Sequence, residues 1–200
     1  MKFNTNFPIP AIIALCSLLA ACGGGNNEQA YYELGETGPG GGKVFLYIRE
    51  GFKMSDADET CYFLEAAPIG ELDSEDKVAW ASPEYTAVNI ASTGTALGTG
   101  RNNTKLILAA DPNAPAAKKC RDYRGPKNKD DWFLPSKKEL DWLEINRGYA
   151  GYSGSGFNDD YFWSSTQVNP TRADTQSIYL RVFSTSLKST GNMVWAIRAF

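Results

Sequence analysis

One stretch, residues 130–140, constrains the fold of this chain more than any other, because an apolar run leads directly into a helix-start signal. It has the sequence Asp-Asp-Trp-Phe-Leu-Pro-Ser-Lys-Lys-Glu-Leu. Pro135 disfavours helical geometry at the residue before it, so the apolar run ends there. Ser136 and Glu139 have the spacing of a capping box, in which each side chain accepts a hydrogen bond from the backbone N–H of the other residue. We therefore expect a helix to begin at Lys137.

The first residues indicate an export signal rather than part of the fold. An apolar run at residues 9–21 is too short to span a bilayer comfortably and is typical of a signal peptide. It ends in Leu-Ala-Ala-Cys, which resembles the bacterial lipobox, whose cysteine is lipidated and becomes the mature N-terminus. We expect residues 1–21 to be a lipoprotein signal peptide, Cys22 to carry the lipid, and residues 22–34 to be a flexible tether. An ordinary secretory signal and a short anchor helix are the alternatives.

The residue after this cysteine is glycine, not aspartate, which resembles the lipoproteins that are sorted to the outer membrane. Removal of the signal would take away one lysine and no acid, leaving 19 basic and 23 acidic side chains. A chain of this charge has no general attraction for nucleic acid, so we expect no nucleic-acid partner. The remaining residues, 35–200, have the length of one domain.

Cys61 and Cys120 are the cysteines left after Cys16 departs with the signal and Cys22 takes lipid. Two thiols in an exported chain favour a disulfide, and closing a loop of this length would stabilise the fold by about 4 kcal/mol. Two free thiols or a redox pair are the alternatives, although the C-x-x-C spacing of a redox pair is absent.

The order of the expected elements indicates an α+β domain. Strands are predicted at residues 43–48, 61–67, 161–166, 177–183 and 193–200, with helices near 104–108, 114–123 and 136–146. A hairpin connection is expected at residues 184–191. Strands at both ends with two or three helices inserted between them predict a mostly antiparallel sheet and chain ends that lie close together.

Six short segments, taken together and in order, carry a resemblance to a known family. They are residues 42–45, 64–68, 98–104, 131–136, 161–166 and 197–200. Together they resemble the Lcl C-terminal-like domain, a bacterial family of largely unknown function, over about residues 35–200. The resemblance implies a C-type-lectin-like fold on an exported protein. Adhesin members of the family are similar to binders of sulfated polysaccharide.

Several kinds of catalytic site are excluded by composition. The chain has no histidine, which removes Ser-His-Asp and Cys-His catalysis, zinc helices of the H-E-x-x-H type and histidine-ligated metals. Acidic clusters at residues 56–59 and 71–76 lack the spacing of a calcium loop. The glycine-rich residues 92–103 lack the G-K-[ST] of a phosphate loop and are expected to be an ordered loop that enters a helix. Asp159 and Asp160 would point to opposite faces of a strand, which disfavours a glycosidase pair. We expect no cofactor and no metal.

The candidate binding residues are cations and one tryptophan. Eight cations lie between residues 118 and 138, either as a solvated face or as a patch for an anionic polysaccharide. The residues predicted to form the patch are Lys118, Lys119, Arg121, Trp132, Lys137 and Lys138. Trp132, like Trp163 and Trp195, either stacks on a sugar or belongs to the core. Arg198, in an otherwise apolar strand, is expected to pair with a buried carboxylate.

These observations favour a non-enzymatic, lipid-anchored envelope protein that binds a glycan or another envelope component, a sulfated polysaccharide being one candidate. Its location would be the cell envelope, attached to the membrane through the N-terminal lipid. A structural envelope protein with protein partners only is the alternative, and an enzyme is the third possibility.

Overall fold

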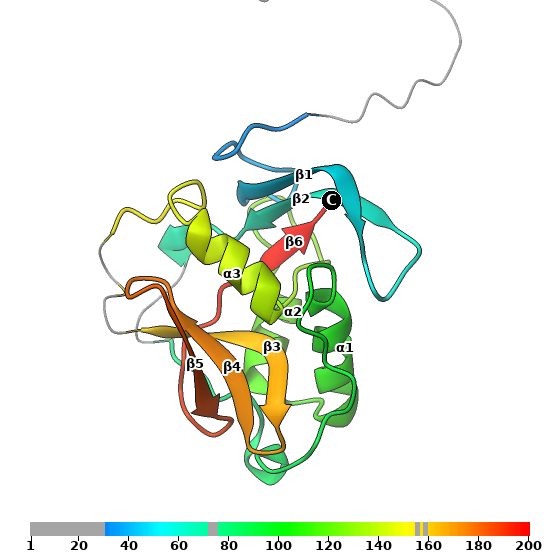
Figure 1. Ribbon diagram of the computed structural model, residues 1–200, viewed down its shortest axis with the longest axis vertical. Helices are drawn as coiled ribbons and strands as arrows, with labels where there is room; N and C mark the ends of the chain where they lie inside the picture. Colours follow the sequence, from blue (N-terminus) through cyan, green and yellow to red (C-terminus); the bar gives the residue numbers. More distant parts are fainter. Residues whose placement is uncertain (1–30, 72–75, 155–156, 158–159) are drawn as a thin grey trace, which may run out of the picture. The chain divides into compact units, whose positions relative to one another are not determined.

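Two small antiparallel sheets and three α-helices make up residues 31–71, 76–154, 157 and 160–200, the part of the chain that this computed structural model describes (Figure 1). This confirms the predicted α+β class. Residues from Tyr32 to Phe200 form one compact unit. The predicted signal peptide and the predicted lipidation site, Cys22, lie outside the described residues.

The first sheet contains β1 (Lys43–Lys53), β2 (Thr60–Ala66) and β6 (Ile197–Ala199), in the order β1-β2-β6. All pairs are antiparallel, and Leu64 of β2 lies opposite Ala199 of β6. The ring edge of Tyr32 packs on the ring of Phe200, with centroids 5.2 Å apart. The two ends of the compact unit therefore meet at this sheet, as predicted.

The central strand of this sheet carries a buried charge. Glu65 is fully buried on β2, opposite Arg198 on β6. Its carboxylate accepts a hydrogen bond from Arg198 Nη1 at 3.0 Å, which confirms the predicted pairing of Arg198 with a buried carboxylate. Arg198 Nε also donates to Asp131.

The second sheet contains β3 (Tyr161–Asn169), β4 (Arg172–Ser177) and β5 (Val182–Leu187), in the order β3-β4-β5. The prediction of one strand across residues 177–183 was wrong, because the chain turns there. The backbone N–H of Arg181 donates to the carbonyl of Ser177 at 3.0 Å, and Arg181 has φ = 61°. The predicted connection at 184–191 was also wrong, since its first half is β5.

The last predicted strand is shorter than expected. Only Ile197–Ala199 forms a strand, while Met193 to Ala196 precede it as buried, irregular backbone. Met193 still lies beside β3, because its carbonyl accepts from Trp163 N at 2.8 Å and its N–H donates to Tyr161 O at 2.9 Å.

The three helices are α1 (Gly100–Ala110), α2 (Pro115–Asp122) and α3 (Lys137–Ile145), and two 3-10 turns occupy Ile69–Glu71 and Pro83–Tyr85. Helix α3 begins where predicted and has the complete capping box. Helix α1 begins earlier than predicted. In Figure 1, α3 crosses between the two sheets, and it contacts β1, β3 and β4. Four tryptophans fill the core: Trp80, Trp132, Trp163 and Trp195.

Candidate functional site

The cations of α2 are already paired with acids of the chain. Lys118 and Arg121 both contact the carboxylate of Asp122, and Lys119 contacts Asp76. Pairs of this kind at an exposed surface contribute little to stability, but they reduce the net positive charge that a ligand would meet. Three cations at the α2 end of the predicted patch therefore share two carboxylates, which leaves one net positive charge there.

Trp132 does not belong to an exposed site, and this part of the prediction is corrected. Its side chain is 2% exposed and packs edge-on against Tyr123, with ring centroids 4.9 Å apart. Side chains at Gly40 and Gly42 would meet its ring, because a Cβ at either position would lie 2.9 Å from a ring carbon. The ring thus fills the space that these glycines leave open, and no face of it is free to stack on a sugar.

Lys137 and Lys138, at the start of α3, line an open pocket of about 320 Å³ together with Thr95, Ala96, Asp141 and Phe183. Lys137 Nζ lies 5.1 Å from the ring centroid of Phe183 and 3.3 Å from Asp174 Oδ1, and Lys138 Nζ lies 2.7 Å from Asp141 Oδ2. Phe183 is 42% exposed on β5. The pocket thus combines two ammonium groups, one carboxylate and an accessible aromatic ring. We refer to it as the α3–β5 pocket.

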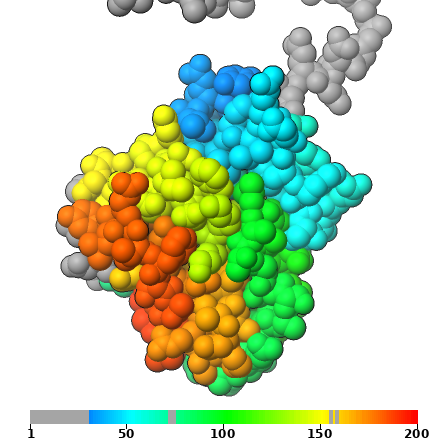
Figure 2. All heavy atoms as spheres, in the orientation of Figure 1, coloured from blue at the N-terminus to red at the C-terminus, as the bar shows by residue number. Residues whose placement is uncertain are grey.

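The surfaces of α3 (yellow-green) and of the β4–β5 hairpin (orange) lie next to each other on the face drawn in Figure 2.

Arg121 and Trp132 line a different pocket, of about 260 Å³. Its other lining residues are Arg101, Thr104, Lys105, Asp130, Asp131 and Phe133. The predicted patch is therefore not one site. Lys137 and Lys138 share the α3–β5 pocket with the exposed ring of Phe183, Arg121 and Trp132 line the second pocket, and Lys118 and Lys119 line neither.

The wall of the α3–β5 pocket is held in place by Ser136 and Glu139. The hydroxyl of Ser136 donates to Ala96 O at 2.8 Å, and the N–H of Lys138 donates to Thr95 O at 2.9 Å. The carboxylate of Glu139 accepts from Ser136 N at 2.7 Å and from Gly98 N at 2.8 Å. These bonds join the loop before α1 to the first turn of α3, so both walls of the pocket are fixed to each other.

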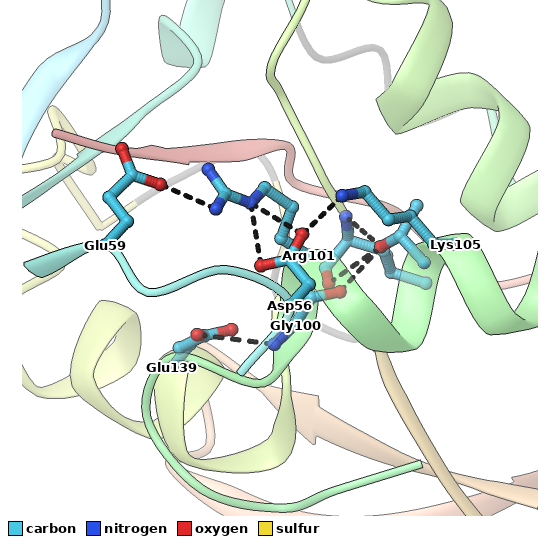
Figure 3. Close-up of polar contacts among 8 residues, drawn as sticks. Asp56, Glu59, Gly100, Arg101, Lys105 and Glu139 are labelled. Atoms are coloured by element: carbon cyan, nitrogen blue, oxygen red, sulfur yellow. Dashed lines mark hydrogen bonds and ion pairs between the residues drawn. The ribbon is translucent and has the colours of Figure 1, made fainter. Parts of the chain in front are cut away.

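Glu139 also occupies the place that a bound anion would take in a phosphate loop. Its carboxylate lies at the start of α1, where it accepts from Gly100 N at 3.4 Å as well (Figure 3). A Cβ at Gly100 would lie 2.1 Å from this carboxylate, so the glycine makes the approach possible. Glu139 is fully buried, and burial raises its pKa to about 7. The glycine-rich residues are an ordered loop that enters α1, as expected, and this loop also surrounds an internal carboxylate.

A second set of charges fixes the β1–β2 connection to α1. Arg101 donates through Nε to both carboxylate oxygens of Asp56, at 3.0 and 3.1 Å, and through Nη2 to Glu59 at 2.6 Å (Figure 3). Lys105 contacts Asp56 as well. These cations lower the pKa of the Asp56 carboxyl, against the effect of its burial. The acidic cluster at residues 56–59 thus serves an ion-pair network.

The largest of these hollows, of about 460 Å³, lies at the other end of α3. It is lined by Ile145, Arg147, Gly148, Tyr152, Ser153, Gly154 and Tyr179. Ile145 and Tyr179 are each 46% exposed, and Tyr149 nearby in sequence is 50% exposed. Sequence reasoning missed Phe183 and Tyr179 as surface aromatic residues, because both were assigned to one continuous strand at residues 177–183.

The predicted disulfide is not formed, and this prediction is corrected. Cys61 lies on β2 and Cys120 on α2, and both are buried free thiols. The count of exported thiols carried no information on whether the two elements would bring them together. Burial raises the pKa of Cys61 to about 11 and raises that of Cys120 as well. Neither thiol is set up as a nucleophile, which requires a lowered pKa.

Two features are absent from the described residues. Among them, no group of three or more Cys, Asp or Glu side chains is arranged to hold a metal ion. Within the same residues, no helix has the length and apolar character needed to cross a membrane.

No model of a known protein family matches this chain. None of the curated proteins compared with it matches either. The resemblance to the Lcl C-terminal-like domain therefore remains a hypothesis that rests on the six sequence segments.

Proposed function

We propose that this chain is a non-enzymatic binding module of the bacterial envelope, anchored through lipid on Cys22, and that its ligand is an anionic glycan. The observation that carries the proposal is the α3–β5 pocket, which Lys137, Lys138 and Asp141 line together with the exposed ring of Phe183. The outer membrane is the proposed location, and a sulfated polysaccharide is the proposed class of ligand.

The chemistry of the pocket suits a sugar that carries negative charge. An exposed aromatic ring offers a flat apolar surface for the C–H face of a sugar, and its burial by the ligand is favourable. The ammonium groups of Lys137 and Lys138 can donate to sulfate or carboxylate, and Asp141 can accept from a hydroxyl. At about 320 Å³ the pocket is at the small end of the usual range for ligand sites, which suits a short part of a polymer.

The C-type-lectin-like fold forms part of the same proposal. Two features support it: β2 and β6 join the beginning and the end of the compact unit in one sheet, and the helices lie between the first and last strands in sequence. A second small sheet beside α3 carries the proposed binding surface.

A structural envelope protein with only protein partners is the second candidate. It is favoured by the exposed apolar side chains near the far end of α3 and the turn before β5. These side chains are Ile145, Tyr149, Tyr179 and Leu180. An enzyme ranks third, since the histidine-dependent reactions are excluded by composition.

Heparin affinity chromatography of the purified full-length chain tests the leading proposal. We expect retention at low salt and elution as salt rises, because exposed charges are screened within about 10 Å at 0.1 M ionic strength. Changing Lys137 and Lys138 together to Glu should lower the salt concentration of elution strongly. Phe183→Ala, which changes no charge, should lower it as well, since the sugar loses its stacking surface.

The matched control is the double change of Lys118 and Lys119 to Glu. It alters the net charge by the same amount. Both pairs of lysines have carboxylate partners, Asp122 and Asp76 for the control and Asp174 and Asp141 at the pocket, so the two double variants differ in whether the exposed ring of Phe183 lies beside the cations. We expect a much smaller shift from this variant. Equal shifts from both double variants would show that retention follows net charge alone, and flow-through of the unchanged chain would refute the proposal.

A further inference from the structure

Exposed apolar side chains gather at the end of α3 and at the turn before β5. They are Ile145, Tyr149, Tyr179 and Leu180, which are 46%, 50%, 46% and 50% exposed. Ile145 and Tyr179 line the same pocket, of about 460 Å³, so the two elements meet there. Neighbouring apolar side chains that face water mark a surface that binds something, unlike single ones scattered over a protein. We refer to these four residues as the apolar patch.

The chain enters the compact unit beside the apolar patch. A Cβ built at Gly35 would lie 3.6 Å from Cδ1 of Tyr149, so the segment that leads into β1 passes against the patch. On the face drawn in Figure 2, the surface near residue 150 (yellow) lies between the surfaces near residue 35 (blue) and near residue 180 (orange). The apolar patch therefore belongs to the end of the domain at which the tether from the proposed lipid joins it.

The length of the tether limits how far this end of the domain can lie from a bilayer. Cys22 precedes Tyr32 by ten positions, and ten residues of fully extended chain span about 35 Å. Tyr32 is fixed to the domain, because its ring packs edge-on against the rings of Phe63 and Phe200. In a chain anchored through Cys22, the membrane surface is therefore an occupant that is always within reach of the apolar patch.

Two arginines lie among the residues of the apolar patch. The buried carboxylate of Glu144 accepts from Arg147 Nη1 at 3.0 Å and from Arg181 Nε at 2.8 Å. One carboxylate thus holds two cations in place, and the side chain of Arg181 is 57% exposed. Each guanidinium keeps further N–H groups that these bonds do not use. Such groups bind phosphate through paired, charge-assisted hydrogen bonds.

The pocket of the apolar patch also contains a hydroxyl without a partner. Tyr152 lines this pocket and is only 8% exposed, and its hydroxyl forms no hydrogen bond within the described residues. Buried polar groups are almost always hydrogen-bonded, so this hydroxyl calls for a partner outside the chain. Arg147 and Ser153 line the same pocket. The pocket thus combines donors for a phosphate group with apolar side chains for the lipid around it.

We propose that the apolar patch is the surface with which the anchored domain lies on the bilayer, a lipid phosphate occupying the pocket of Arg147 and Tyr152. The proposal rests on the lipid anchor at Cys22 and adds which face of the domain meets the membrane. Tyrosine suits this position, because its ring prefers the apolar side and its hydroxyl the polar side of a membrane interface. Glu33 and Glu36, on the segment that leads into β1, oppose attraction to an anionic surface. Contact should therefore depend on the apolar side chains and on phosphate, and little on salt.

Fluorescence of the lipidated full-length chain in phosphatidylcholine vesicles tests the proposal. A polarity-sensitive dye on Leu180→Cys should shift its emission to the blue and be quenched by spin-labelled lipid. Val168→Cys is the matched control: Val168 is 48% exposed near the end of β3, and the β3–β4 turn lies at the opposite end of Figure 1 from the segment that leads into β1. Its dye should show neither change. The unchanged chain gives the background from the buried Cys61 and Cys120. Equal emission and quenching of the two dyes would overturn the proposal and leave the apolar patch to a protein partner.

The pocket is tested by adding Tyr152→Phe to the labelled Leu180→Cys chain. This change removes a hydroxyl that has no partner within the described residues, so the fold should keep its stability in urea. We expect a clear loss of quenching by spin-labelled lipid, and unchanged quenching would refute the headgroup pocket. The mass of the mature chain shows whether Cys22 carries lipid, which separates a failure of the anchor from a failure of the contact surface. Quenching should also persist as salt rises, whereas heparin retention should fall, so the two proposals fail independently.

Discussion

Glu65 and Glu139 are both fully buried, and both accept hydrogen bonds from the backbone of a glycine-rich loop. Within the described residues, a cation contacts Glu65 and none contacts Glu139. The comparison separates two ways of holding a carboxylate inside a small domain. In one, a positive side chain compensates the charge. In the other, backbone dipoles alone surround it.

At Glu65 the loop of residues 38–42 wraps the carboxylate. Gly40 N donates at 2.8 Å and Gly42 N at 3.0 Å, and Arg198 supplies the cation. A Cβ at Gly38 would lie 2.5 Å from the carboxylate, so the loop can approach only because that position lacks a side chain. Burial raises the pKa of Glu65, and Arg198 opposes this effect.

At Glu139 the donors to the carboxylate are the backbone N–H groups of Ser136, Gly98 and Gly100. Ser136 is also the N-cap residue of α3. No cation contributes to its pKa, which burial raises to about 7. Buried charge without a counter-ion is costly, so this carboxyl takes up a proton close to neutral pH. We therefore expect the contribution of Glu65 to the free energy of unfolding to depend mainly on Arg198. The contribution of Glu139 should depend mainly on pH.

The largest expected effect is the loss of Arg198. Arg198→Met leaves Glu65 buried without its cation, and we expect a loss of about 3–5 kcal/mol in the free energy of unfolding. Denaturation in urea measures this change. The double variant Glu65→Gln, Arg198→Met removes both charges and should lose clearly less than the sum of the two single variants. Additive losses would mean that the two side chains do not act as a pair.

The next effect comes from removing the acceptor at the second site. Glu139→Ala leaves the N–H groups of Ser136 and Gly98 buried without their acceptor, and we expect a loss of roughly 2–3 kcal/mol. Glu139→Gln is the control, since its amide oxygen can still accept from one or two of these groups. It should retain a good part of the stability in the same urea titration. If both variants lost the same amount, the carboxylate would matter for its charge and not as an acceptor.

A third prediction concerns pH. The pKa of Glu139 is raised in the folded state above the ordinary value of 4.5, so between about pH 4.5 and 7 the folded chain keeps a proton that the unfolded chain releases. The stabilisation from this group is complete below pH 4.5 and is lost as the pH rises through 7. Urea titrations across this range should show the decline, and Glu139→Gln should make it shallower. An unchanged pH profile in that variant would show that Glu139 does not titrate there.

Sequence reasoning succeeded where the signal was local. The capping box of Ser136 and Glu139 depends on four consecutive residues, so α3 was placed correctly. The contact between Glu139 and Gly98 spans 41 positions, and nothing local marks it. In the same way, the apolar residues 178–180 continue a strand-like pattern through what is a turn, which concealed both the β4–β5 hairpin and the exposure of Phe183. The buried Lys188, whose ammonium donates to Val88 O and Gln167 Oε1, carried no signal at all.

The smallest expected effect isolates the cap from the carboxylate. Ser136→Ala removes the acceptor for Glu139 N and the donor to Ala96 O, while Glu139 keeps its bond to the backbone N–H at position 136. The usual cost of a lost N-cap is about 1 kcal/mol, and we expect a fall of that size in the free energy of unfolding measured in urea. Thr99→Ala provides the comparison at α1, because Thr99 is the N-cap residue there but makes no side-chain cap hydrogen bond. Its hydroxyl donates only to Ala96 O at an exposed position, so its loss should cost less. A Thr99→Ala loss as large as that of Ser136→Ala would show that the cap hydrogen bond is not what makes Ser136 important for stability.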